Sequence, residues 1–256
     1  MWIAFVILLL FFAAQLVAAL MLELYGNFEA ISTEGSFSFI PLDQFTPAAI
    51  GTATLVAEVL LMVVLWVFRF TSYHPLSVYR RGMPRQWYVG IGGFVLLAFG
   101  LSFLLLPFDL NDFGMMAQFE GMKSNVFCLL LLCLVGPMTE EFVFRDGIQR
   151  VLAEKGLKPS IAILTSAMAF AVVHGNPMQM VPAFFMGLAL GVLYHKTNDL
   201  RLCLLAHVLN NSLAVLEMEI PRLDECLETL PMAFVLTLAV MFVSYGTWCI
   251  YYFVKK

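Results

Sequence analysis

The sequence predicts an all-α, polytopic membrane protein, a bundle of about eight transmembrane helices. Of its 256 residues, 61% are hydrophobic and 12% are charged, whereas soluble domains average roughly 45–50% apolar and 25% charged residues. The apolar residues gather in runs of about 17–25, the length that crosses a bilayer as a helix. The sequence offers no cluster of basic residues that would form a nucleic-acid-binding groove. It also contains no domain-sized soluble insertion between the apolar runs. We therefore expect a single integral membrane domain, 1–256, whose environment is the lipid bilayer, and no nucleic-acid partner.

The apolar runs are distributed over the whole chain. They are 1–22, 47–68, 87–108, 125–145, 160–174, 178–194, 200–216 and 231–254. The first is interpreted as a retained helix, because no basic residue precedes it and no small-residue cleavage site follows it. The runs 160–174, 178–194 and 200–216 are short, which predicts tilts, breaks or helices that continue beyond the membrane.

Positive charge is concentrated on one side of these predicted spans. Twelve of the fourteen Lys and Arg residues lie there: Arg69, Arg80, Arg81, Arg85, Arg145, Arg150, Lys155, Lys158, Lys196, Arg201, Lys255 and Lys256. By the positive-inside rule this side is cytoplasmic. An even number of crossings then predicts that both termini are cytoplasmic. The opposite loops are rich in Asp and Glu, which fits an exterior face.

The stretch 136–147, Gly-Pro-Met-Thr-Glu-Glu-Phe-Val-Phe-Arg-Asp-Gly, places ionisable side chains at the end of the fourth run. Charges in hydrocarbon are costly, so such residues usually face the bundle interior and serve a function. Glu141 and Arg145 are four residues apart on one helix face and can pair. Glu140 points about 100° away and needs another partner. A structural salt-bridge network is the alternative interpretation.

A further intramembrane carboxylate, Glu58, lies near the middle of the second run. We expect it to face the bundle and to be satisfied by a hydroxyl such as that of Thr54, one turn away. An accessory role in the site is the alternative.

Two later runs also carry polar side chains at helical spacing. The fifth ends in Phe170-Ala-Val-Val-His174, and the seventh contains His207-Val-Leu-Asn-Asn211. Phe170 and His174 share a helix face, as do His207 and Asn211. At ~1.5 Å per residue, Glu140 and His174 both lie ~22 Å from the turn between their helices, so they can meet. A hydrogen-bonded core residue is the alternative for either histidine.

Two carboxylates, two imidazoles and an amide can hydrolyse a peptide bond by either of two routes. In the first, Glu140, His174 and His207 bind Zn²⁺ or another divalent ion, which lowers the pKa of bound water to about 7. In the second there is no metal, and Glu140 and His174 polarise the water. His207 and Asn211 then donate hydrogen bonds to the oxyanion. The residue types leave both routes open.

The motifs Glu140-Glu141-x-x-x-Arg145, Phe170-x-x-x-His174 and His207-x-x-x-Asn211 resemble, in order and spacing, those of the CPBP family. This family of intramembrane proteases includes type II CAAX prenyl endopeptidases and Abi-like bacteriocin-processing or self-immunity proteins. The likeness covers about residues 125–216, the predicted catalytic core.

The resemblance implies an eight-helix bundle with a buried polar site open toward the cytoplasm. It also implies a catalytic role for Glu140, Glu141, His174 and His207. In addition, it implies that Arg145 orients a glutamate and that Asn211 supports the site. The family's arginine is commonly followed by glycine, whereas here Asp146 precedes Gly147. Asp146 is therefore a potential competitor for Arg145.

The sequence thus predicts an intramembrane endopeptidase that cleaves a membrane-associated peptide or protein, either prenylated and CAAX-type or of the leader or bacteriocin type. The alternative is a non-catalytic membrane partner, an immunity or regulatory protein that binds a peptide or a membrane protein. A proton-coupled transporter is disfavoured, because the two halves of the chain show no inverted repeat.

Overall fold

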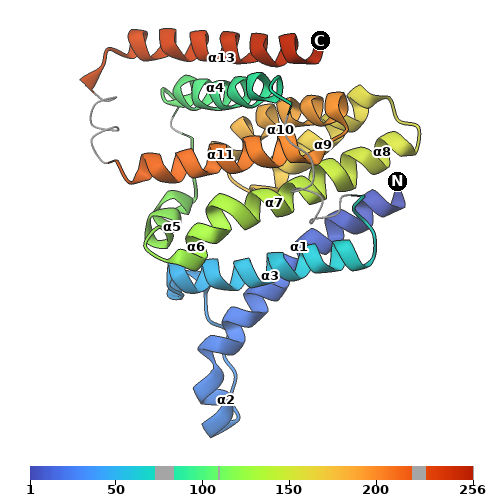
Figure 1. Ribbon diagram of the computed structural model, residues 1–256. Coiled ribbons are helices and arrows are strands. Elements are labelled where there is room, and N and C mark those ends of the chain that lie inside the picture. Colours follow the sequence, from blue (N-terminus) through green and yellow to red (C-terminus); the bar gives the residue numbers. More distant parts are fainter. Residues whose placement is uncertain (73–83, 109, 221–228, 256) are drawn as a thin grey trace.

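The computed structural model describes residues 1–72, 84–108, 110–220 and 229–255, and within these ranges the regular structure is entirely helical. The long helices run side by side, and both termini lie at the same end of the bundle as α8 (Arg150–Glu154) (Figure 1). This end carries most of the described basic residues. Four of the basic residues counted from the sequence lie outside the described ranges: Arg80, Arg81, Arg222 and Lys256.

Seven helices of the described chain are long and apolar enough to cross a membrane. They are α1 (Trp2–Gly26), α3 (Pro47–Val67), α4 (Trp87–Leu105), the composite helix Val126–Glu154, α10 (Pro177–Thr197), α11 (Leu200–Met218) and α13 (Met232–Lys255). The predicted run at 160–174 forms α9 (Pro159–Val173), which is apolar but has only 15 residues. The prediction of an all-α polytopic membrane bundle is confirmed, with seven long spans and one shorter helix.

Short helices connect some of the spans, and side-chain caps mark where three of the spans begin. The connecting helices are α2 (Phe28–Glu34), η1 (Leu42–Gln44) and α5 (Met115–Met122). Thr46, Asn176 and Asp199 each accept a hydrogen bond from a backbone N–H in the first turn of α3, α10 and α11. Such caps satisfy amide groups that have no partner within the helix. The starts of these spans are therefore encoded locally.

Helices α4 and α13 lie against each other at one side of the bundle (Figure 1). A Cβ atom at Gly246 would lie 2.6 Å from the Gly93 carbonyl oxygen, and one at Gly93 would lie 2.9 Å from that of Gly246. Only glycine permits this approach, which is a common device of helix packing in membranes. Gly92, by contrast, has open space around its Cβ position.

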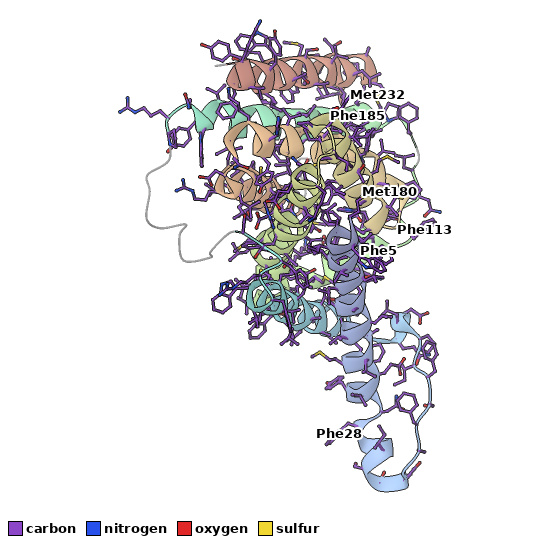
Figure 2. The ribbon with its side chains drawn as sticks, turned by 90° about the vertical axis from the view of Figure 1, so that its right-hand side faces the viewer. Phe5, Phe28, Phe113, Met180, Phe185 and Met232 are labelled. Atoms are coloured by element: carbon purple, nitrogen blue, oxygen red, sulfur yellow. The ribbon has the colours of Figure 1, made fainter. Side chains whose placement is uncertain are left out.

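The outer faces of the helices are apolar. Phe5, Phe28 and Phe185 are among the large hydrophobic side chains that project outward (Figure 2). An exposed apolar surface of this extent is unfavourable in water and fits contact with lipid.

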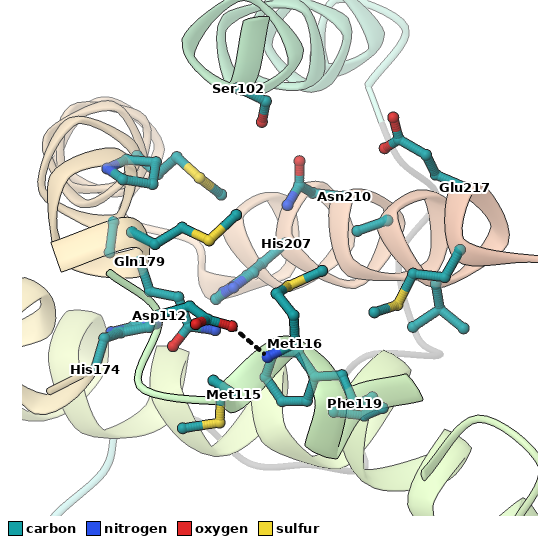
Figure 3. A pocket seen from close by; sticks show the side chains of 18 of the residues that line it. Ser102, Asp112, Met115, Met116, Phe119, His174, Gln179, His207, Asn210 and Glu217 are labelled. Carbon is teal, nitrogen blue, oxygen red and sulfur yellow. Dashed lines mark hydrogen bonds between the residues drawn. The ribbon is translucent and has the colours of Figure 1, made fainter. Parts of the chain in front are cut away.

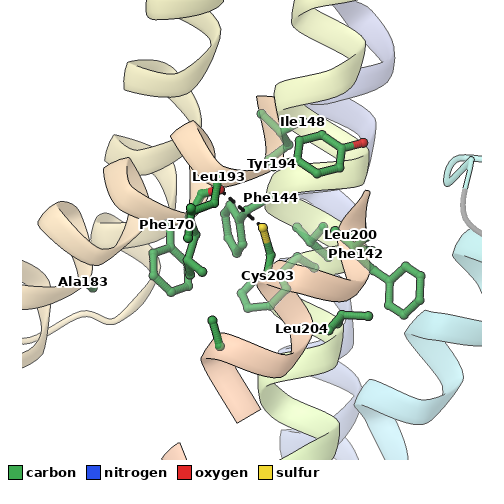
Figure 4. Close-up of a cluster of buried hydrophobic side chains, with 14 of the residues drawn as sticks. Phe142, Phe144, Ile148, Phe170, Ala183, Leu193, Tyr194, Leu200, Cys203 and Leu204 are labelled. Atoms are coloured by element: carbon green, nitrogen blue, oxygen red, sulfur yellow. Dashed lines mark hydrogen bonds between the residues drawn. The ribbon is translucent and has the colours of Figure 1, made fainter. Parts of the chain in front are cut away.

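A dense apolar cluster lies where the composite helix meets α9, α10 and α11 (Figure 4). Phe144, Phe170, Leu193 and Cys203 are almost completely buried in it. The rings of Phe144 and Phe170 meet edge to face, with centroids 5.2 Å apart. This packing fixes the positions of the helices that carry the polar site.

Candidate active site

The two glutamates are carried by a composite helix that is not regular. It consists of α6 (Val126–Leu130), the π-helix η3 (Leu131–Val135), α7 (Gly136–Glu141), the π-helix η4 (Phe142–Gln149) and α8. Short π-helical turns within α-helices often mark functional sites. Here they stand on both sides of Glu140 and Glu141.

Two glycines accommodate the wider π-helical turns. A Cβ atom at Gly136 would lie 2.9 Å from the Leu131 carbonyl oxygen, and one at Gly147 would lie 3.0 Å from that of Phe142. In each case the crowding group is the carbonyl five residues earlier, the spacing of a π-helical turn. Gly147 therefore belongs to the backbone geometry that places Arg145.

Glu141 and Arg145 form the predicted pair, and both side chains are completely buried. Arg145 Nε lies 3.1 Å from Glu141 Oε2. The guanidinium carbon lies 4.6 Å from the centroid of the Phe170 ring. The 3.1 Å approach is at ion-pair distance but lacks hydrogen-bond geometry, and within the described residues the Arg145 nitrogens have no hydrogen-bond acceptor. The carboxylate and the ring face are thus what compensate this buried charge.

Asp146 does not compete for Arg145. Its carboxylate accepts hydrogen bonds from the backbone N–H of Ser72 at 2.7 Å and from the Ser72 hydroxyl. It also accepts from Arg150 Nε and from the Tyr194 hydroxyl, each at 3.1 Å. Asp146 therefore fastens η4 to the segment that follows α3 and to α10.

His207 is the partner of both glutamates. Its Nδ1 lies 2.9 Å from Glu141 Oε1, and its Nε2 lies 3.5 Å from Glu140 Oε2. The side chain of Glu140 is 21% exposed, whereas that of Glu141 is fully buried. A carboxylate accepts hydrogen bonds, so we assign the hydrogen to Nδ1. Glu141 thus orients His207 and leaves its Nε2 beside Glu140.

His174 is held in a similar way at the end of α9. Its Nδ1 donates to the Phe170 carbonyl oxygen at 2.7 Å, because a carbonyl can only accept. Gly175 follows with a φ of +73°, which ends the helix and starts the turn into α10. The centroid of the Phe170 ring lies 4.8 Å from that of His174 and 5.9 Å from that of His207. Phe170 therefore links His174 to the glutamate pair.

The two asparagines of α11 differ in their surroundings. Asn211 donates from Nδ2 to the Leu132 carbonyl oxygen of η3 at 3.2 Å, and its Oδ1 accepts from Asn210 Nδ2 at 3.3 Å. Asn210, which belongs to none of the three motifs, lines a pocket beside His207, as does Gln179 of α10. The sequence signal for Asn210 was its place next to Asn211, whereas Gln179 follows no motif.

Glu58 lies at the edge of this cluster. It is only 6% exposed and neighbours Thr139 and Glu140 of α7. The hydroxyl of Thr54 donates to the Ile50 carbonyl oxygen instead. A third carboxyl group thus lies beside the glutamate pair.

A pocket of about 430 Å³ adjoins both histidines. His174, His207 and Asp112 surround one space in Figure 3, with Met115 and Met116 beside it. The lining extends along α11 to Glu217 and Met218, at the end of the bundle opposite α8. With the basic end in the cytoplasm, as the charge pattern predicts, this end of the pocket faces the exterior. The family resemblance implies a site open toward the cytoplasm, at the opposite end.

One of the two routes left open by the sequence has Glu140, His174 and His207 binding a divalent ion. Glu140 Oε2 and His207 Nε2 have a separation compatible with two ligands of one tetrahedral Zn²⁺, since each metal–ligand bond is about 2.0–2.2 Å long. No group of three His, Cys, Asp or Glu side chains with metal-site geometry occurs among the described residues. Residues present in the site thus fit only part of such a centre.

Fold and geometry together define a class: a polytopic helical membrane protein with a buried glutamate–histidine cluster beside a pocket, consistent with a catalytic site. Residues 122–213 match the family model described as type II CAAX prenyl endopeptidase Rce1-like, so this part of the chain is a domain of that family. The family resemblance predicted from the motifs is confirmed, and it implies a protease. No curated protein and no solved structure gave a match.

Proposed function

We propose that the protein is an intramembrane endopeptidase that hydrolyses a peptide bond of a membrane-associated substrate, prenylated and CAAX-type or leader-type, with an activated water. One observation carries the proposal: His174 and His207 both line the pocket and are each held through Nδ1, by Phe170 and Glu141, and Glu140 lies 3.5 Å from His207 Nε2. Fixing one ring nitrogen leaves Nε2 of each imidazole for the reaction.

Glu140 acts as the general base. Its carboxylate is partly exposed and lies 3.5 Å from His207 Nε2, which leaves room for a water that both groups contact. Glu140 takes one proton from this water while the water oxygen attacks the carbonyl carbon. When the carbon–nitrogen bond breaks, Glu140 returns the proton to the leaving amine nitrogen. The products are a carboxylic acid and an amine.

The two histidines complete the proposed mechanism. His174 Nε2 accepts the second hydrogen of the water and so orients it. His207 Nε2 faces the same water and donates to the oxyanion when it carries a hydrogen. Glu141 and Arg145 are positioning residues, because Glu141 orients His207 and Arg145 balances the charge of Glu141. Asn211 supports the site by holding α11 against η3.

The test is cleavage of internally quenched peptides by the full-length protein in lipid nanodiscs, with one prenylated CAAX-type and one leader-type peptide. Glu140→Gln is expected to lower kcat by about 10²–10⁴-fold, as for loss of a general base. His207→Gln is expected to lower it by about 10²–10³-fold. The matched control is His195→Gln, an exposed histidine in the last turn of α10. Turnover at the wild-type rate in the Glu140 variant would end the proposal.

The non-catalytic alternative makes a different prediction for the same samples. A binding partner would retain the peptide without forming a cut product, and the Glu140→Gln substitution would leave that binding in place.

No step of this proposal passes through a metal ion. We therefore expect cleavage to persist after chelation and dialysis, with metal content measured on the same preparation. Loss of cleavage together with loss of one bound Zn²⁺, and recovery of both on adding Zn²⁺, would favour the metal route through Glu140, His174 and His207 instead.

A further inference from the structure

Two primary amides line the pocket beside the histidines without belonging to the three motifs. Gln179 lies in the first turn of α10, and Asn210 lies on α11 one turn after His207. They stand on different helices around the space that both histidines border (Figure 3). The proposed mechanism gives neither amide a part, so their free donors and acceptors are available to a ligand.

The orientation of the Gln179 carboxamide is fixed by Asn176, the N-cap of α10. Asn176 Oδ1 accepts from the Gln179 backbone N–H at 3.0 Å, and Asn176 Nδ2 donates to the His174 carbonyl oxygen at 3.2 Å. The same Nδ2 also donates to the Gln179 side chain at 2.8 Å, and the atom that accepts is Oε1. No described residue accepts from Gln179 Nε2. This nitrogen is therefore a donor held ready for a ligand.

Asn210 is fixed in the opposite sense by Asn211. Asn211 Nδ2 donates to the Leu132 carbonyl oxygen at 3.2 Å, so its Oδ1 accepts from Asn210 Nδ2 at 3.3 Å. Asn210 Oδ1 has no donor among the described residues and points toward Ser102 of α4 in Figure 3. The Ser102 hydroxyl donates to the Ala98 carbonyl oxygen at 3.2 Å, so its oxygen can also accept. This side of the pocket thus offers acceptors, whereas Gln179 offers a donor.

A donor and an acceptor on separate helices match the two polar groups of a peptide backbone. A peptide carbonyl accepts a hydrogen bond, and a peptide N–H donates one. Either group costs free energy when it enters an apolar site without a partner. The apolar part of the lining includes Met115, Met116, Met178 and Met186, whose flexible thioethers accommodate side chains of different shape. Recognition through the backbone therefore suits this pocket better than recognition of one particular side chain.

We propose that Gln179 and Asn210 bind the peptide backbone of the substrate beside the scissile bond. Gln179 Nε2 donates to a substrate carbonyl oxygen, and Asn210 Oδ1 accepts from a substrate N–H. The inference rests on the proposed function and adds the two residues that hold the substrate. A substrate bound in this way is non-helical at this point, because a helix uses the same groups for its own hydrogen bonds.

The position of the bound N–H can be estimated along α11. His207 and Asn210 are three residues apart, which corresponds to ~4.5 Å on a helix. An extended peptide covers ~3.3 Å per residue, so the N–H bound by Asn210 lies about one or two residues from the attacked carbonyl.

The test uses internally quenched apolar peptides, each N-methylated at one peptide bond other than the scissile one, and full-length protein in lipid nanodiscs. N-methylation removes one N–H. At one position near the scissile bond we expect it to lower the wild-type kcat/KM by roughly 5- to 50-fold, as for a buried acceptor left unpaired. Asn210→Ala should cleave the unmethylated peptide more slowly by a similar factor, and methylation at that position should have no further effect.

The substitution Gln179→Glu tests the donor. It keeps an oxygen that accepts from Asn176 and removes the Nε2 donor. The wild type should lose roughly 5- to 50-fold in kcat/KM when one peptide bond is replaced by a trans-alkene, which keeps the shape of the bond and lacks its carbonyl oxygen. Gln179→Glu should cleave the parent peptide more slowly and lose this sensitivity. The matched control is Gln44→Glu, the same change at an exposed residue of η1 outside the pocket lining, and it should keep all wild-type ratios.

Equal losses on N-methylation in the wild type and in Asn210→Ala would overturn the proposal. Cleavage of every methylated peptide at the unmethylated rate by the wild type would also overturn it, and this result needs no variant to fold.

Binding of the same peptides to Glu140→Gln and to Glu140→Gln/Asn210→Ala separates this proposal from the proposed function. If the wild type cuts nothing, the proposed function fails. A methylation penalty on binding that Asn210→Ala removes would still support backbone binding, whereas binding that methylation leaves unchanged would refute it.

Discussion

Replacing Arg145 tests the buried charge network that positions His207. Arg145 and Glu141 are both 0% exposed, and the guanidinium lies over the Phe170 ring. Arg145→Met keeps most of the side-chain volume but leaves the Glu141 carboxylate without its cation. Breaking a buried pair by removing one partner costs about 3–5 kcal/mol. Because the 3.1 Å contact lacks hydrogen-bond geometry, we expect a loss near 3 kcal/mol.

The double variant Glu141→Gln/Arg145→Met isolates the pair. It leaves no uncompensated charge, so its loss of stability should be smaller than the sum of the two single losses by about 1–3 kcal/mol. The assay is reversible unfolding in mixed micelles, with the free energy obtained from far-UV circular dichroism against the fraction of denaturing detergent. Lys158→Met, at the exposed start of α9, is the control and should change stability by less than about 0.5 kcal/mol. Additive losses, or a loss below about 1 kcal/mol for Arg145→Met, would refute the reasoning.

Three further outcomes are expected. Gly147→Ala should destabilise by about 1–3 kcal/mol in the same unfolding assay, because its methyl group would meet the Phe142 carbonyl oxygen, whereas Gly92→Ala should be neutral or slightly stabilising. Tyr194→Phe should cost about 1–2 kcal/mol, since it removes a hydrogen bond to the buried Asp146 carboxylate; an unchanged free energy would contradict this. A green fluorescent protein fused to the C-terminus should fluoresce if that end is cytoplasmic; an active alkaline phosphatase fusion there would reverse the predicted orientation.

Much of the fold follows from local sequence. The apolar runs located the spans because a helix must be long enough to satisfy its backbone across the bilayer. Run length also indicated three short segments, 160–174, 178–194 and 200–216. Of these, the first forms the 15-residue α9, whereas α10 and α11 extend beyond their runs to 21 and 19 residues. Helix α9 is short because the chain turns at Gly175 into α10. This turn also brings His174, at the end of α9, to the pocket.

The sequence by itself determined the spans and the relations within one helix, such as Glu141 with Arg145 and Phe170 with His174, because a helix fixes neighbours four residues apart. Only the tertiary structure decided the relations between helices: that His207 meets both glutamates and that the pocket leads toward Asp112. The physical reason is rotation. Each π-helical turn adds a residue and turns the following face, and no local pattern in the apolar sequence reports that change.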